Sequence, residues 1–297
     1  IIVGAGNDYL YMVLTTIMGN HHKIAFENPT YKRDYQLFYN LSYETCTVDI
    51  DEQGMDVSKL EQSNADIAFV MPSHQYPLGI VMPVKRRLEL LQWAEKKADR
   101  YIIEDDYDSE FRYKGKPIPA LQGYDNHEKV IYVGTFSKSI APAIRVSYIV
   151  LPRILLQQYW KKSGFLNSTV SKVDQLILQK FIEEGYYERH LNKTRALYKG
   201  RHDRLLASLK CLRTQFDISG ENAGVHLLLH CKNKMSETEL IQRAADKDVK
   251  VYGLSEYYVK QQMQKQATIL LGYANMQEKS IVEAVRLLKE AWTEKDA

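Results

Sequence analysis

The sequence predicts an α/β fold in which a mainly parallel sheet is flanked by helices and followed by a smaller C-terminal α+β domain. In the first half, short apolar runs bounded by turn-forming residues alternate with segments of helical period. Strands that are apolar throughout and alternate with helices are typical of parallel sheets covered on both faces. After Pro152 the pattern changes to longer amphipathic and charged segments, which indicates the second domain.

The expected strands of the first half are apolar runs rich in β-branched residues. They are Ile1–Val3, Lys23–Phe26, Asp66–Met71, Tyr101–Ile103, Lys129–Val133 and Val146–Leu151. Between the third and fourth of these runs, Val84–Ala98 repeats apolar side chains at helical spacing, with Val84, Leu88 and Leu91 on one face. We therefore expect a helix there that packs against the sheet.

Beyond Pro152 the sequence predicts long helices and then a small mixed unit. The helices are predicted by the charged run Glu188–Leu209 and by an apolar stripe made of Val173, Leu176, Ile177, Phe181 and Ile182. The small unit should contain a strand at Val225–Leu229, a helix at Leu240–Ala245 capped by Ser236 and Glu239, strands near Val249–Tyr252 and Thr268–Leu271, and a closing helix around Ile281–Trp292. We expect a large domain over residues 1–160, connecting helices over 161–210 and a small domain over 211–297.

Composition excludes several classes of protein. The 297 residues are 45% apolar, and 40 Lys and Arg balance 37 Asp and Glu, which is typical of a globular chain and gives no support for a polyanion-binding surface. Three widely spaced cysteines, Cys46, Cys211 and Cys231, exclude a disulfide scaffold and predict a reducing compartment, the cytoplasm. No apolar run approaches the ~18 residues that span a bilayer. Because the chain opens inside an apparent strand, we expect it to be a fragment whose beginning is missing.

Candidate site residues follow the predicted strands, because ligands of open parallel sheets bind beyond the carboxyl ends of the strands. The turn Gly4–Asn7 opens a predicted helix, whose N–H groups and dipole favour an anion; a tight strand-to-helix turn is the alternative. The acidic run Glu104–Asp108 needs a cation or a ligand, or else it is a solvated loop. Metal binding is a rival interpretation, but no His-rich segment lies nearby, and we predict no metal.

The segment after Val133 places Lys138 among hydroxyl and apolar residues. A lysine in a partly desolvated pocket loses proton affinity and becomes a nucleophile for carbonyls, as a Schiff base requires. Thr135, Ser137 and Arg145 supply hydroxyl and guanidinium donors suited to a phosphate.

These segments together meet the requirements of pyridoxal 5′-phosphate. This cofactor needs a lysine for its aldehyde, an aspartate facing the ring nitrogen, a polar group at the phenolate oxygen, an aromatic face and an anion-binding cup. The chain offers Lys138, Asp105, Tyr107, Tyr31 and a cup formed by Ala5, Gly6 and Asn7 with Thr135, Ser137 and Arg145.

Five segments carry a resemblance to a known family. They are Glu27–Tyr31, Pro72–Gly79, EDDYDSEFRY at Glu104–Tyr113, GTFSKSIAPAIR at Gly134–Arg145, and Glu188–Leu191. In this order they resemble, over essentially the whole chain, the aminotransferase-like domain of MocR/GabR-type bacterial transcription regulators of the GntR family. That resemblance implies the fold type I architecture of aspartate aminotransferase. EDDYDSEF together with TFSK and HQ-x-P is more diagnostic of this subgroup than of aminotransferases at large.

The resemblance implies a role for each residue. Lys138 forms the internal aldimine, and Asp105 pairs with the pyridine nitrogen. Tyr107 bonds the phenolate oxygen, and the spacing of two from Asp105 points both side chains the same way. The remaining expected contacts are Tyr31 stacked on the ring, His74 and Gln75 near the ring oxygen where most aminotransferases carry Asn before Pro, and Ala5, Gly6, Asn7, Thr135, Ser137 and Arg145 around the phosphate.

The chain departs from the pattern of the resemblance in two places. The winged helix-turn-helix and linker of the regulators are absent, so DNA binding by the usual route would need a domain outside this chain. No arginine lies between Arg243 and Arg286, where aminotransferases present one to the substrate carboxylate. Arg33, two residues after Tyr31, could bind an effector carboxylate instead, or it is a solvent-facing side chain.

The leading functional hypothesis is a sensor in which an amine or amino-acid effector exchanges with Lys138 at the cofactor, in a homodimer. The alternative is a true fold type I aminotransferase, although the missing arginine argues against efficient turnover of α-amino acids. A nucleotide-binding protein that uses Gly4 and Gly6 fits poorly, because the third glycine of the fingerprint would fall at Tyr9. His226, in an apolar run, is expected to be a satisfied core histidine.

Overall fold

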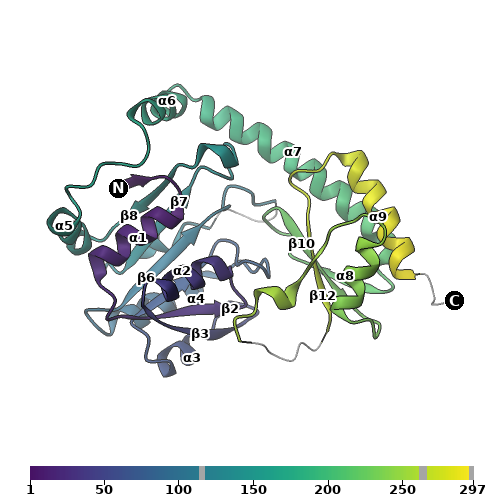
Figure 1. Cartoon of the computed structure of the whole chain (residues 1–297), viewed down its shortest axis with the longest axis horizontal. Helices are drawn as coiled ribbons and strands as arrows, with labels where there is room; N and C mark the ends of the chain where they lie inside the picture. The colour runs from purple at the N-terminus through teal and green to yellow at the C-terminus, as the bar shows by residue number, and fades with distance from the viewer. Residues whose placement is uncertain (114–117, 261–265, 294–297) are drawn as a thin grey trace. The chain divides into compact units, whose positions relative to one another are not determined.

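Figure 1 shows the chain as a computed structural model, in which residues 1–113, 118–260 and 266–293 are described. They form two compact units. The first contains Ile1–Tyr76, Ile80–Glu110 and most of the residues that lead up to Asn192, and the second is built mainly from Lys193 onward. The finer division expected at residues 160 and 210 stays a prediction.

An eight-stranded sheet forms the centre of the first unit, in the order β1-β8-β7-β6-β5-β2-β3-β4. Strands β3, β2, β5, β6 and β7 run parallel, whereas β8 is antiparallel to β7 and β1, and β4 is antiparallel to β3. The expected mainly parallel sheet is therefore confirmed. The strands are β1 (Ile2–Gly4), β2 (Lys23–Asn28), β3 (Glu44–Asp51), β4 (Gly54–Met55), β5 (Ile67–Val70), β6 (Tyr101–Asp106), β7 (Val130–Thr135) and β8 (Ser147–Val150).

Alternate residues of the central strands bury against two different hydrophobic clusters. Ile67 and Phe69 of β5 join the cluster that includes side chains of α1, α2 and α5, whereas Ala68 and Val70 join the cluster of α3 and α4. The sheet is thus covered on both faces, which explains why these strands are apolar throughout. The helices of this part are α1 (Asn7–Met18), α2 (Lys32–Asn40), α3 (Val57–Gln62), α4 (Val84–Glu95), α5 (Arg153–Lys162) and α6 (Lys172–Glu183).

The second unit contains a four-stranded antiparallel sheet of order β11-β12-β10-β9. Ser236 caps α8 by accepting a hydrogen bond from the Glu239 N–H at 3.1 Å, as the sequence predicted. His226 is 3% exposed and its Nε2 lies 2.8 Å from the Pro77 carbonyl, which confirms a core histidine. The elements are β9 (Phe216–Ser219), β10 (His226–Cys231), α8 (Glu237–Ala245), β11 (Tyr252–Gly253), β12 (Thr268–Gly272) and α9 (Glu278–Thr293).

The structure differs from the sequence prediction at four elements. Strand β6 continues past Ile103 to Asp106, so the acidic residues are part of the strand rather than a loop after it. Strand β3 was not predicted, because Thr and Asp interrupt its few apolar residues. The apolar stripe of α6 lies on a helix with no buried residue. The long helix α7 (Tyr186–Ser208) begins two residues before its predicted start.

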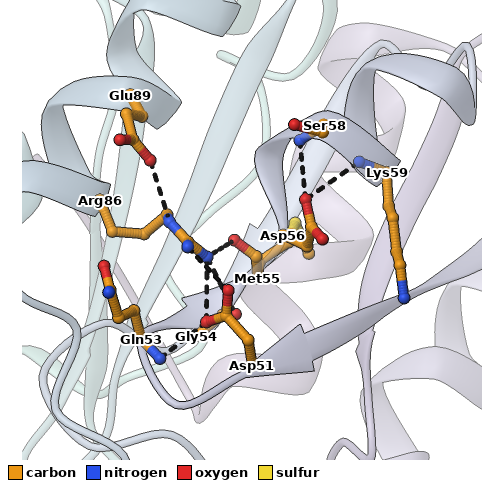
Figure 2. A network of polar contacts seen from close by, with 9 residues as sticks. All are labelled: Asp51, Gln53, Gly54, Met55, Asp56, Ser58, Lys59, Arg86 and Glu89. Atoms are coloured by element: carbon orange, nitrogen blue, oxygen red, sulfur yellow. Dashed lines mark hydrogen bonds and ion pairs between the residues drawn. The ribbon is translucent and has the colours of Figure 1, made fainter.

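A compact charge network fixes the β3–β4 edge of the first sheet (Figure 2). Arg86, in the first turn of α4, donates to the Asp51 carboxylate at 3.2 and 2.8 Å and to Glu89 at 3.0 Å. Its Nη1 also donates to the carbonyls of Gly54 and Met55. The carboxylates of Asp51 and Glu89 neutralise the charge of the buried Arg86 guanidinium. Among the described residues, no helix is both long and apolar enough to cross a membrane.

Candidate functional site

A cavity of about 280 Å³ lies in the first unit, where β5, β6 and β7 end and α1 and α2 begin. This is the edge of the sheet at which ligands of parallel sheets are expected. Nine of the residues proposed from sequence line it: Asn7, Tyr31, Arg33, Asp105, Tyr107, Thr135, Ser137, Lys138 and Arg145. Five residues that the sequence analysis did not single out complete the wall: Asp8, Asp34, Met71, Tyr76 and Ser147.

The strand geometry of β6 separates the acidic run. Glu104 accepts hydrogen bonds from the N–H groups of Leu121 and Gln122, and Asp106 accepts one from the Tyr132 hydroxyl at 2.7 Å. Only Asp105 of these three lines the cavity, as the alternation of side chains along a strand requires. The described residues contain no cluster of three or more His, Cys, Asp or Glu side chains placed to hold a metal ion.

Asp105 is buried among other acidic groups. Its Oδ1 accepts a hydrogen bond from Asn7 Nδ2 at 3.1 Å. Burial raises the pKa of its carboxyl well above the ordinary value, and the charges of Asp34, Asp106 and Asp108 raise it further. A carboxyl in these surroundings is stabilised by any cationic group that enters the cavity.

Asp34 is a second buried carboxyl in the same wall, and it was missed in the sequence because it belongs to a charged run with Lys32 and Arg33. It lies in the first turn of α2 and is 5% exposed. Burial, with a contribution from Asp8, raises the pKa of Asp34 to about 7, although Arg33 acts in the opposite direction.

The turn after β7 presents Lys138. Thr135 Oγ1 accepts hydrogen bonds from the Ser137 N–H at 3.2 Å and from Ser147 Oγ at 2.9 Å, and these bonds hold the turn in shape. Lys138 is exposed and lines the cavity. The exposed side chain of Lys138 differs from the partly desolvated amine that the sequence predicts at this position.

The start of α1 meets Arg145 at one end of the cavity. Gly6 has a φ of +91°, a conformation that favours glycine, and a Cβ there would displace the guanidinium of Arg145. Arg145 Nη2 lies 3.6 Å from Asp8 Oδ2. Neither Ala5 nor Gly6 is in the cavity wall: the Ala5 N–H donates to Thr169 Oγ1 at 2.9 Å and the Gly6 N–H to the Gly4 carbonyl at 2.9 Å.

Three tyrosines form the aromatic part of the wall. Tyr31 meets Tyr76 edge to face, with ring centroids 5.8 Å apart, and Tyr76 meets Tyr107 in the same way at 6.2 Å. Tyr31 and Tyr107 were expected here from the sequence, whereas Tyr76 was not. The signal was available, since Tyr76 directly follows His74-Gln75 in a motif that was already assigned to the site.

His74 and Gln75 are each 1% exposed and stand behind the cavity wall. The Nδ1 atom of His74 lies 2.9 Å from Asp108 Oδ2 and 2.9 Å from the Tyr107 hydroxyl oxygen. Gln75 Nε2 donates to the carbonyls of Pro29 and Tyr76 at 2.9 and 2.8 Å. Both side chains therefore support residues that face the cavity.

Arg33 stands at the rim of the cavity. Its side chain is 70% exposed, and its Nη2 lies 3.9 Å from Asp8 Oδ2. A guanidinium that is exposed and weakly paired can bind an anion from solution without breaking a buried contact.

Residues 1–288 match the family described as aminotransferase class I and II. The chain is 38% identical to the uncharacterized HTH-type transcriptional regulator YdeL of Bacillus subtilis, over 98% of this chain and 63% of that protein. It is 31% identical to the probable rhizopine catabolism regulatory protein MocR of Rhizobium meliloti, over 98% of this chain and 59% of that protein. The expected resemblance to MocR-type regulators is confirmed, and the chain spans about three fifths of their length.

The solved structures agree on the fold. The kynurenine aminotransferase of Pyrococcus horikoshii is similar to this chain with a TM-score of 0.83 and 26% identity, over 97% of this chain and 74% of that one. This likeness and the family match confirm the expected fold type I architecture, including the smaller C-terminal unit with its antiparallel sheet.

Proposed function

The chain belongs to the aminotransferase class I and II family, and on that premise we propose that it is the effector-binding domain of a MocR-type transcription regulator. In this proposal the cavity holds pyridoxal 5′-phosphate, and Lys138 forms the covalent bond to the cofactor aldehyde. One observation carries the proposal: a single cavity collects Lys138, Asp105, Tyr31 and Arg145 from four separate segments.

Unsatisfied polar atoms in the wall support a ligand of this chemistry. Ser137 Oγ and Asn7 Oδ1 are buried and have no hydrogen-bond partner among the described residues. Buried polar atoms are rarely left unpaired in native folds, and a bound group is one explanation. Ser137 stands one residue from Lys138, and Arg145 is held against the turn at Gly6 that precedes α1. The residues present fit a phosphorylated aldehyde.

Each residue then has a definite part. As a carboxylate, Asp105 accepts the hydrogen bond of a protonated ring nitrogen, which supplies the counter-charge that this buried group lacks. Tyr107 keeps its hydrogen and donates it to the phenolate oxygen, because burial and nearby carboxylates raise the pKa of its hydroxyl well above the ordinary value. Ser137 and Arg145 bind the phosphate, and Tyr31 covers the ring. The cofactor, when bound, supplies an aldehyde for amines and a ring that withdraws electrons.

Sensing follows if an effector amine takes the place of the Lys138 amine at the aldehyde carbon. Arg33, at the rim, is the cation that would bind a carboxylate of the effector. Exchange alters regulation only if the two forms have different affinities for two conformations of the protein. The ligand class is therefore a small primary amine or amino acid, and turnover is not required.

A true aminotransferase is the second candidate, favoured by the likeness to solved enzymes of that class. Against it stands the absence of any arginine between Arg243 and Arg286, the stretch that contains the strand expected to carry the carboxylate-binding residue.

We also propose a homodimer in the cytoplasm, which contacts DNA through a helix-turn-helix domain that is not part of these 297 residues. More than a third of YdeL, named as an HTH-type regulator, lies outside the matched range. Exposed apolar side chains on α6 support the dimer: Val173, Leu176 and Ile177 are 65%, 57% and 62% exposed. Apolar patches of this kind mark interaction surfaces.

The proposal is tested by absorbance. The purified chain, incubated with pyridoxal 5′-phosphate and dialysed, should retain a near-ultraviolet or violet band that changes when the right primary amine is added. A panel of amines, amino acids and dipeptides would identify the ligand class. With a keto acid present, the sensor should release less than one equivalent of new amino acid per chain. Repeated turnover would establish the enzyme instead, and a colourless dialysed protein would exclude the cofactor.

A further inference from the structure

Three side chains form a buried chain of contacts that ends at the cavity. Tyr107 lines the cavity, whereas His74 and Asp108 are behind it and each has a side chain only 1% exposed. His74 Nδ1 lies 2.9 Å from the Tyr107 oxygen and 2.9 Å from Asp108 Oδ2. A single ring nitrogen therefore faces two oxygen atoms at once.

The position of one hydrogen follows from this geometry. If Nδ1 had no hydrogen, its lone pair would face a carboxylate oxygen at hydrogen-bond distance, and two acceptors would repel one another. Nδ1 must therefore donate its hydrogen, which is shared between Asp108 and the oxygen of Tyr107. A tyrosine oxygen that accepts from His74 keeps its own hydrogen for another acceptor. The cavity is the side on which Tyr107 meets open space.

We propose that His74 and Asp108 are positioning residues, which fix Tyr107 as a hydrogen-bond donor directed into the cavity. Asp108 orients the His74 ring and sets its tautomer, and His74 occupies the acceptor side of the Tyr107 oxygen. The bond that Tyr107 then makes is the one to the cofactor phenolate oxygen, so the inference rests on the proposed function. It also assigns His74 a part different from the direct ring contact that the sequence suggested.

If His74 and Asp108 are positioning residues, they should affect the absorbance of the bound cofactor only through Tyr107. When the cofactor is bound, a hydrogen-bond donor at its phenolate oxygen would favour the deprotonated form of the cofactor, in which the negative charge of that oxygen has no partner within the cofactor itself. Loss of the donor should raise the pH at which the bound cofactor changes colour. The titratable groups whose charges act on Tyr107 are Asp108, Tyr76, Asp105 and Asp106, and each substitution below changes at most one of them.

The experiment is a pH titration of the absorbance of the chain loaded with pyridoxal 5′-phosphate. Tyr107→Phe and His74→Leu should each raise the midpoint by about one pH unit, which is tenfold in proton affinity. Asp108→Asn, in which the new side chain is similar in size to the native one, should raise the midpoint by less than His74→Leu does. His74→Asn places an amide N–H near the position of Nδ1 and should restore most of the native midpoint. Asp106→Asn, a control at a buried carboxyl of the same strand that bonds Tyr132, should leave it unchanged.

The double variant Tyr107→Phe with His74→Leu separates positioning from general damage. If His74 acts through Tyr107, the double variant should titrate like Tyr107→Phe alone. A native midpoint in both His74→Leu and Asp108→Asn, beside a shifted Tyr107→Phe, would overturn the proposal, as would an unshifted Tyr107→Phe or additive shifts in the double variant. A native chain with no cofactor band at any pH would instead overturn the proposed function, so the two failures are distinguishable.

Discussion

Two regions of the first unit bury charged side chains. In one the buried charge has partners of opposite charge, and in the other buried carboxyls lie near further carboxyls. At the β3–β4 edge, Arg86 is 9% exposed and is bonded to Asp51, to Glu89 and to backbone carbonyls. In the cavity wall, Asp34 and Asp105 are 5% and 6% exposed, and each is destabilised by the charge of a neighbouring carboxyl. In the first region the chain itself neutralises the buried charge, whereas in the second, burial and neighbouring carboxyls raise the pKa of both aspartates.

The pKa values of two aspartates express the same difference. Burial alone would raise the pKa of Asp51, but its hydrogen bonds from Arg86 and from the Gln53 N–H lower it below the ordinary value. Burial and Asp8 raise the pKa of Asp34 to about 7. Perturbed groups gathered at a cavity are typical of functional sites, where local stability is lost so that a ligand can restore it. The comparison predicts that the edge stabilises the free chain and that the cavity is stabilised by its ligand.

Breaking the neutralised region should have the largest effect. Arg86→Ala removes the partner of Asp51 and leaves the Gly54 and Met55 carbonyls without a buried donor. We expect the free energy of unfolding in urea to fall by about 3 kcal/mol. Arg153→Ala, which breaks an ion pair whose arginine side chain is 89% exposed, is the control and should cost less than about 1 kcal/mol. Equal losses in the two variants would remove the distinction between the regions.

Breaking the cavity should alter binding more than folding. Asp105→Ala should weaken binding of pyridoxal 5′-phosphate by about 30-fold, close to 2 kcal/mol, because the ring nitrogen loses its counter-charge. The same variant should leave the cofactor-free chain as stable as before or more stable. Asp106→Ala is the matched comparison, since Asp106 bonds Tyr132 and does not line the cavity. Equilibrium dialysis measures the cofactor affinity of both variants. A greater loss of affinity in Asp106→Ala would mean that Asp106, and not Asp105, pairs with the ring nitrogen.

The raised pKa of a buried carboxyl in the cavity wall should make the stability of the chain depend on pH. A carboxyl whose pKa is raised in the folded chain favours folding below its unfolded pKa of about 4, and this contribution is lost as pH rises through the folded value. Because the folded-state pKa of Asp34 is about 7, the free energy of unfolding of the cofactor-free chain should fall between pH 4 and pH 7. Burial raises the pKa of Glu27 to about 8, and this carboxyl therefore changes the stability in the same direction.

Asp34→Asn sharpens this prediction. The variant should stabilise the cofactor-free chain by about 1–2 kcal/mol at pH 8 and flatten the fall with pH. Thermal unfolding followed across this range measures the effect, and Glu52→Gln, at an exposed carboxyl, should follow the native profile. An Asp34→Asn profile parallel to the native one would show that this carboxyl does not cause the fall in stability with pH.

The smallest effect is expected at the rim. Arg33→Ala should weaken an acidic effector several-fold, about 1 kcal/mol, while cofactor affinity stays unchanged, because the side chain is exposed and only weakly paired with Asp8. Titration of the absorbance change with the effector measures it. Lys32→Ala, the neighbouring cation outside the cavity wall, serves as the control. Equal affinity in native and Arg33→Ala chains would assign the carboxylate to another group.

The sequence predicted the part of the site that lies directly after strands. Lys138 and Asp105 follow or end apolar runs, and the topology of a parallel sheet then brings them to one edge. Asp34 was missed because its burial depends on how α2 packs, which no local pattern reports. His74 was assigned to the ring because a motif gives the order of residues but not which side chains face the cavity. Strand β3 was missed because tertiary packing overrides its weak apolar pattern.

The central claim is that one amine in the described chain, that of Lys138, forms the covalent bond with a B6 aldehyde. Borohydride reduction of the loaded chain, followed by proteolysis and mass spectrometry, tests it directly. We expect a reduced pyridoxyl adduct on the peptide that contains Lys138, and no adduct there in Lys138→Ala. A chain that is saturated with the cofactor but reduced at another lysine, or at none, would contradict the account.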